Sequence, residues 1–125
     1  MANLTVGQVL LQVDALLPNQ YTAEEKCRWI RQAEGFVWEE VIGLHKGEEN
    51  APMATQWDED TELLVAAPYD ELYRYYVEAQ IHYANGEMNR YNNACAAWNN
   101  ALLTYRDYYC RHHMPRQKVK ALHLC

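Results

Sequence analysis

Apolar residues recur at intervals of three and four along most of the chain, the spacing of one face of an α-helix. The first such segment follows Thr5, which forms a capping-box pattern with Gln8, and it ends before Pro18. A second capping-box pattern, Thr22 with Glu25, opens another helix. The inward face of this second helix is expected to carry Cys27, Ile30, Ala33, Val37, Val41 and Leu44.

Gly35 lies inside the second helical pattern. A glycine in the interior of a helix costs roughly 1 kcal/mol relative to alanine. We therefore expect a kink or a break at Gly35, with the second half of the helix ending near Gly43 or Gly47.

Residues 45–67 show the least regular pattern and contain glycine, proline and a run of acidic residues. This segment is predicted to be a long loop. Its last part, residues 63–67, is apolar and too short to form a helix of its own. We expect this part to lie extended against the core or against a neighbouring subunit.

Two more helices are predicted after Pro68, joined at Asn85 and Gly86 into a helical hairpin. The inward face of the first is predicted to carry Tyr69, Leu72, Tyr76, Ala79 and Tyr83. The inward face of the second is predicted to carry Met88, Tyr91, Cys95, Trp98, Leu102, Tyr105, Tyr109 and His112. At about 1.5 Å per residue the second helix would be on the order of 40 Å long, so part of its surface is expected to be buried by another chain.

These patterns predict an all-α fold: a small helical bundle of four to five helices with a long C-terminal helix, a long loop and an extended C-terminal arm. A chain of 125 residues is the size of one domain. We expect a helical domain over residues 1–115, ended by Pro115, and an arm over residues 116–125. The sequence contains no apolar run that could span a bilayer and begins without a secretion signal, so synthesis in the cytoplasm is expected.

The net charge of -6 is unevenly distributed. Residues 111–125 contain four basic residues and no acidic one, which leaves 7 basic and 17 acidic residues, a net charge of -10, in the preceding chain. Such an acidic body disfavours wrapping of DNA, because phosphate binding depends on clustered lysine and arginine. The basic segment suggests an arm that docks on an acidic surface.

Motifs of catalysis or cofactor binding are absent from the sequence, so no catalytic residue and no cofactor are expected. The four cysteines form no C-x-x-C pair and are expected to be free thiols. The best candidate metal ligands are Cys110, His112, His123 and Cys125, with His113 adjacent. On a helix, however, Cys110 and His112 point about 200° apart, and we expect no metal site.

Most of the ten tyrosines are crowded onto the two helices of the predicted hairpin. Several of them lie off the predicted inward face, and aromatic side chains with a polar tip are enriched at protein interfaces. The candidate interface residues are these tyrosines and the basic residues near the C-terminus: Tyr73, Tyr75, Tyr108, Arg111, Arg116, Lys118 and Lys120.

A series of short segments carries a family resemblance. They are residues 29–30, 64–73, 79–81, 83–87, 90–93, 98–99 and 113–115. In this order they resemble the small head-to-tail connector proteins encoded in the structural modules of phages and prophages of gut bacteria. The resemblance covers roughly residues 21–115, and none of its segments is a catalytic signature.

The resemblance implies a structural protein of the virion neck, not an enzyme, made and assembled in the bacterial cytoplasm. It implies a homo-oligomeric ring, expected to be dodecameric, that binds the portal protein and docks other neck or tail proteins. Genomic DNA would pass through the ring without sequence-specific binding, and no membrane would be involved. The alternatives are a free-standing cytosolic helical module that binds one protein and, less in keeping with the motifs, a small metal-dependent enzyme.

Overall fold

The computed structural model describes residues 3–44 and 57–112. The helices within these ranges are α1 (Val6–Leu16), α2 (Ala23–Glu40), a short 3-10 helix η1 (Ile42–Leu44), α3 (Leu72–Ala84) and α4 (Met88–His112). The described ranges contain no β-strand, only an isolated antiparallel bridge between Thr5 and Glu62. The predicted all-α bundle with a long last helix is therefore confirmed, while the arm over residues 116–125 lies outside the described residues.

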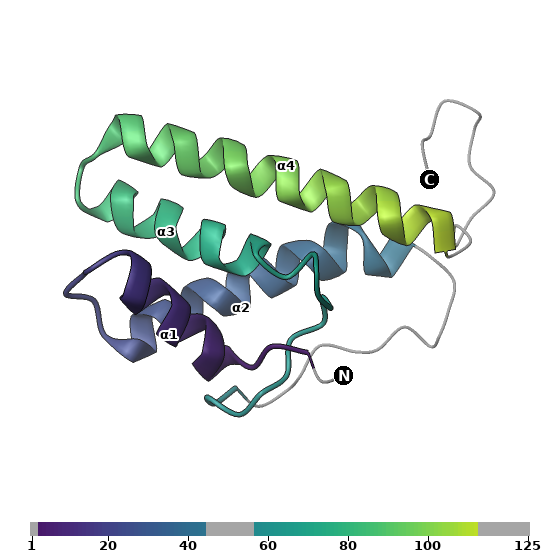
Figure 1. The fold of residues 1–125 in the computed structure, drawn as a ribbon, viewed down its shortest axis with the longest axis horizontal. Coiled ribbons are helices and arrows are strands. Elements are labelled where there is room, and N and C mark those ends of the chain that lie inside the picture. Colours follow the sequence, from purple (N-terminus) through teal and green to yellow (C-terminus); the bar gives the residue numbers. More distant parts are fainter. Residues whose placement is uncertain (1–2, 45–56, 113–125) are drawn as a thin grey trace.

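The helices form layers around α3 (Figure 1). On one side α3 packs against α1 and α2, and on the other side it packs against α4. Among the described helices α4 packs mainly on α3. The predicted helical hairpin is present, and its turn contains Gly86 with a φ of +78°, which glycine adopts without strain.

Both predicted capping boxes are present. Thr5 Oγ1 accepts a hydrogen bond from the Gln8 N–H at 3.3 Å, and Gln8 Oε1 accepts one from the Thr5 N–H at 2.9 Å. Thr22 and Glu25 make the same reciprocal pair at 3.1 and 3.0 Å. Because each box satisfies two backbone N–H groups, local sequence sets where α1 and α2 begin.

The break expected at Gly35 is absent, because α2 runs as one helix from Ala23 to Glu40. Ile30, Ala33 and Val37 on this helix are fully buried. Burial of their side chains outweighs the roughly 1 kcal/mol that a helical glycine costs. The helix ends close to the predicted position, since η1 follows around Gly43.

Residues 57–71, which we call the strap, connect the first half of the chain to α3. The strap crosses the start of α1, where the Val6 N–H donates to the Thr61 carbonyl and the Gly7 N–H donates to the Glu59 carbonyl, both at 2.9 Å. A Cβ atom at Gly7 would lie 3.0 Å from that Glu59 carbonyl oxygen. Glycine at this position therefore allows the strap to approach α1 closely.

The apolar part of the strap is buried in the core of its own chain. Leu63 and Val65 are 1% and 0% exposed. Residues 63–65 therefore lie against the core of their own chain, the first of the two placements predicted for residues 63–67, whereas Ala66 and Ala67 are exposed.

α3 has two buried faces because it lies between α4 and the α1–α2 pair. The face predicted to point inward meets α4, where the Tyr76 ring lies 5.0 Å from the Trp98 ring. A second face, with Tyr73, Val77 and Ile81, is also fully buried. The prediction that Tyr73 lies off the core was therefore wrong, since one periodic face cannot describe a helix that is covered on two sides.

The limits of α3 also differ from the prediction. The helix begins at Leu72, four residues after Pro68, so Tyr69 belongs to the strap. At the other end Tyr83 is 60% exposed, although its ring lies 5.1 Å from that of Tyr91. The predicted inward face is thus correct from Leu72 to Ala79 and wrong at Tyr83, while Tyr69 packs against the core from the strap.

The inner face of α4 is the predicted one from Tyr91 to Tyr109, whereas Met88 and His112 at its two ends are exposed. Trp98, Tyr105 and Tyr109 are its buried residues, and Trp98 is 9% exposed. The indole ring packs edge-on against Tyr76 and against Phe36 of α2, with ring centroids 5.0 and 6.3 Å away. The predicted core position of Trp98 is confirmed.

Replacing Trp98 by alanine is expected to lower the free energy of unfolding by about 3–5 kcal/mol, because it removes a buried ring contacted from two helices. Urea unfolding followed by circular dichroism measures this loss. The control is Leu103→Ala on the same helix, where the leucine is 46% exposed and the expected loss is below about 1 kcal/mol. Equal losses for the two variants would show that Trp98 does not anchor the core.

Candidate functional site

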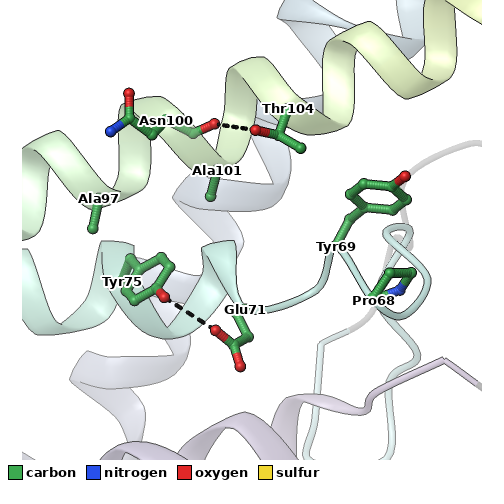
Figure 2. A pocket seen from close by; sticks show the side chains of 8 residues that line it. All are labelled: Pro68, Tyr69, Glu71, Tyr75, Ala97, Asn100, Ala101 and Thr104. Atoms are coloured by element: carbon green, nitrogen blue, oxygen red, sulfur yellow. Dashed lines mark hydrogen bonds between the residues drawn. The ribbon is translucent and has the colours of Figure 1, made fainter.

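An open groove of about 330 Å³ lies between the start of α3 and the middle of α4 (Figure 2). It is lined by Pro68, Tyr69, Glu71, Tyr75, Ala97, Asn100, Ala101 and Thr104. The short side chains of Ala97 and Ala101 leave a hollow on the α4 side, and the rings of Tyr69 and Tyr75 border it on the other. We call this the α3–α4 groove.

The polar groups of the groove are engaged with one another. The Tyr75 hydroxyl donates to Glu71 Oε1 at 3.0 Å, and Arg74 lies 3.5 Å from the same carboxylate oxygen. The Arg74 guanidinium also lies over the Tyr75 ring, 4.7 Å from its centroid. The hydrogen bond to Glu71 raises the pKa of Tyr75, which keeps the phenol protonated. Aromatic surface with hydroxyl and amide groups is typical of protein–protein contacts.

Two of the predicted interface residues lie at this groove. Tyr75 lines it, and the Tyr108 ring stacks on Tyr69 with centroids 4.7 Å apart and planes inclined by 28°. The His112 ring also lies 4.6 Å from the Tyr108 ring, measured between centroids. The structure thus brings Tyr75 and Tyr108 to one region through Tyr69, whose role the sequence did not indicate.

The other predicted interface residues are placed differently. Arg111 is exposed at the end of α4. Tyr73 is 0% exposed, so no partner could contact it on the surface. Arg116, Lys118 and Lys120 lie outside the described residues.

A buried polar cluster, which the sequence pattern did not indicate, lies around Glu34 of α2. Glu34 Oε2 accepts a hydrogen bond from the Leu64 N–H at 2.8 Å, and Oε1 accepts one from the Tyr73 hydroxyl. The Tyr73 oxygen in turn accepts a hydrogen bond from the Val65 N–H at 3.1 Å. The sequence could have indicated this cluster, because Glu34 lies one helical turn after the apolar Ile30 and so on the same face of the helix.

Burial governs the ionisation of this cluster. Glu34 is 2% exposed, and loss of hydration raises its pKa to about 7, even though the hydrogen bonds from Tyr73 and Leu64 favour the charged form. Burial and the neighbouring carboxyl group also raise the pKa of Tyr73. The cluster links α2, α3 and the strap, and none of its residues lines the α3–α4 groove.

Two other buried ionisable groups hold helix ends together. Lys26 Nζ lies 2.6 Å from Asp14 Oδ1 and donates to Asn19 Oδ1 at 3.1 Å, which joins α1 to α2. The hydrogen bond from Lys26 lowers the pKa of Asp14. At the hairpin, His82 Nδ1 lies 2.8 Å from Glu87 Oε1, and this contact lowers the pKa of Glu87. These contacts give Lys26 and His82 hydrogen-bonding partners, which accounts for their burial by structural roles.

Histidine, cysteine and acidic side chains do not gather into a possible metal site within residues 3–44 and 57–112. Cys27 and Cys95 are free thiols, as expected, but Cys110 is disulfide-bonded, so the expectation of four free thiols was wrong. Sequence spacing does not reveal which thiols fold close together. Of the other candidate metal ligands, His112 is exposed, and His113, His123 and Cys125 lie outside the described residues.

Comparisons of the chain with protein-family models, with curated protein sequences and with solved structures gave no match. In the described part of the chain, no helix combines the length and apolarity needed to cross a membrane. Any functional assignment therefore depends on the surfaces described above and on the sequence resemblance.

The raised pKa of Glu34 predicts how stability varies with pH. The folded chain binds a proton on Glu34 more tightly than the unfolded chain, whose pKa is near the ordinary 4.5. The resulting stabilisation is complete below about pH 4.5 and is lost as pH rises through 7. Relative to a Glu34→Gln variant, which mimics the protonated group, the parent should lose on the order of 3 kcal/mol over this range.

Urea unfolding at a series of pH values measures this difference. The matched control is Glu39→Gln, an exposed position on the same helix, which should keep the pH dependence of the parent. Parallel pH profiles for the parent and Glu34→Gln would contradict the assignment of a protonated, buried Glu34.

Proposed function

We propose that this chain is a structural protein of a tailed-phage virion, a head-to-tail connector subunit that assembles as a ring on the portal. In this role it extends the DNA channel and docks the next neck or tail component. The observation that carries the proposal is the outer side of α4, which stays exposed among residues 3–44 and 57–112. α4 has 25 residues and is about 37 Å long, so this outer side is long as well.

The composition of the outer side of α4 favours its burial by another chain. Its exposed positions at three-to-four-residue spacing are Asn89, Asn93, Ala96, Asn100, Leu103, Asp107 and Arg111. Residues 91–105 contain no charged residue at all. An exposed helix face usually carries charged side chains. A solvent-facing stretch without charge is therefore better suited to contact with protein than to permanent exposure.

The charge distribution supports the same proposal. A body with a net charge of -10 repels phosphate, so DNA can pass through a ring of such subunits without adhering to it. The four basic residues within 111–125 provide the opposite charge for docking on an acidic surface of the portal or of a neighbouring subunit.

In this proposal the chain is made in the bacterial cytoplasm and acts in the virion neck as a homo-oligomeric ring, expected to be dodecameric. It catalyses no reaction and needs no cofactor. The α3–α4 groove also favours a second candidate, a free-standing cytosolic module that binds one protein. The two differ in size, because a connector joins a large ring and the module stays a small particle.

Light scattering of the chain with and without the portal protein of the same genome tests the proposal. We expect the chain to join the portal in a particle of ring size. Deletion of residues 116–125 should abolish this incorporation without changing the helical content, because it removes Arg116, Lys118 and Lys120. Higher salt should also weaken incorporation, since the Debye length falls from about 10 Å at 0.1 M to about 3 Å at 1 M.

A triple variant with glutamine at positions 116, 118 and 120 is the matched control for the deletion, because it keeps the length of the arm and removes its charge. Loss of incorporation in both variants assigns the effect to charge. Normal incorporation of both would place the portal contacts elsewhere, and a chain that never joins the portal would contradict the connector proposal.

A further inference from the structure

The turn between α3 and α4 contains an asparagine followed by a glycine, Asn85 and Gly86. Asparagine is a chemically labile side chain, because the backbone nitrogen of the next residue can attack its side-chain carbonyl carbon. Glycine in the next position leaves that nitrogen unshielded, since it has no Cβ atom. Asn85 and Gly86 are both exposed, so water reaches them. The turn therefore contains a candidate site of spontaneous deamidation.

The backbone of the turn holds the two reacting atoms apart. Asn85 has a ψ of -6°, which places the Gly86 nitrogen nearly eclipsed with the Asn85 nitrogen. Closure of the five-membered succinimide ring requires the Gly86 nitrogen to be eclipsed with the Asn85 Cβ atom instead. The turn is therefore far from the geometry in which the atoms can react.

Two backbone hydrogen bonds stabilise this unreactive conformation. The Gly86 N–H donates to the Tyr83 carbonyl at 3.1 Å. The Glu87 N–H donates to the His82 carbonyl at 2.9 Å. Together with the positive φ of Gly86 they form the Schellman motif that ends α3. A change of ψ at Asn85 must break this motif.

The side chain of Asn85 is held from a distant part of the chain. The Tyr21 hydroxyl, in the connection between α1 and α2, donates to Asn85 Oδ1 at 2.6 Å. The Tyr21 ring is itself anchored, because it packs edge-on against Trp29 of α2 with ring centroids 5.6 Å apart. This hydrogen bond forms with the native turn and therefore stabilises the conformation in which Asn85 does not react.

Deamidation would also place a charge where it is unfavourable. The Glu87 carboxylate lies 2.8 Å from His82 Nδ1, and hydrogen bonds from His82 and from the Asn85 side chain lower the pKa of Glu87. Deamidation replaces the Asn85 amide by a carboxylate, which repels Glu87 and lies at the negative end of the α3 dipole. The modification would therefore weaken the turn that joins the helical hairpin.

We propose that Asn85 is a deamidation site that the native turn and the Tyr21 hydroxyl keep nearly unreactive. In the reaction the Gly86 nitrogen bonds to Asn85 Cγ and gives up its proton, while the bond from Cγ to the side-chain nitrogen breaks and ammonia leaves. Water then opens the succinimide at either carbonyl, which leaves an aspartate or an isoaspartate at position 85. The reaction is hydrolytic and needs no oxidant or reductant.

Timed incubation at neutral pH, followed by tryptic digestion and mass spectrometry, measures the rate. Cleavage after Arg74 and Arg90 releases residues 75–90, which contain Asn85 and, as an internal reference, the exposed Asn89. In the chain unfolded by guanidinium, Asn85 should react faster than Asn89, because the residue after Asn89 is an arginine. In the folded parent, Asn85 should react far more slowly than in the unfolded chain.

Tyr21→Phe is the deciding variant, because it keeps the ring against Trp29 and removes only the hydroxyl. The folded variant should deamidate at Asn85 about two- to tenfold faster than the parent, the factor that loss of one net hydrogen bond gives. The matched control is Tyr76→Phe, which also removes a hydroxyl that donates to a side-chain amide, that of Gln32 at 3.0 Å. This control should deamidate at the rate of the parent, and circular dichroism checks that both variants are folded.

An unchanged or slower rate in Tyr21→Phe overturns the proposal, and a slower rate would mean that the hydroxyl stabilises the negative charge that develops on Oδ1 during attack. Equal acceleration by Tyr76→Phe also overturns it, since general destabilisation would then be the cause. An unfolded chain in which Asn85 reacts no faster than Asn89 contradicts the assignment of the site. Tyr21 and Asn85 lie outside α4 and the C-terminal arm, so this experiment and the portal experiment fail independently.

Discussion

A carboxyl group in the apolar interior constrains the arrangement of this fold. Burying a polar group is costly unless hydrogen bonds compensate for the lost hydration, and Glu34 receives such bonds from the Leu64 N–H and the Tyr73 hydroxyl. α2, α3 and the strap must therefore meet at one point. The same cluster fixes Leu63 and Val65 in the core and positions the start of α3, which borders the α3–α4 groove.

Features set by neighbouring residues could be predicted from the sequence. The capping boxes at Thr5 and Thr22 begin their helices as expected, because each needs only residues within one turn. The middle of the inner face of α4 was also predictable, with Trp98 in the core, because α4 is buried along one periodic face. In both cases the local sequence pattern is sufficient to determine the feature: the start of the helix in one case and its buried face in the other.

Features that depend on distant segments could not be predicted in this way. Tyr73 was expected on the surface, but α3 is covered on two sides and Tyr73 reaches Glu34, 39 residues earlier in the chain. Gly35 was expected to interrupt α2, but tertiary packing keeps the helix whole. Of the candidate site, the sequence indicated Tyr75 and Tyr108, whereas the groove itself requires the α3–α4 pairing and the placement of Tyr69 by the strap.

The central claim is that the Glu34 cluster joins the strap to the helices as one cooperative unit. Native-state hydrogen exchange at the Leu64 and Val65 amides tests it most directly, because these N–H groups donate to Glu34 and Tyr73. The account predicts that both amides exchange only through global unfolding, with the same free energy of opening as the Ile30 amide in α2. Exchange through local opening, at a free energy far below that of Ile30, would show that the strap is held independently of the bundle and would contradict the account.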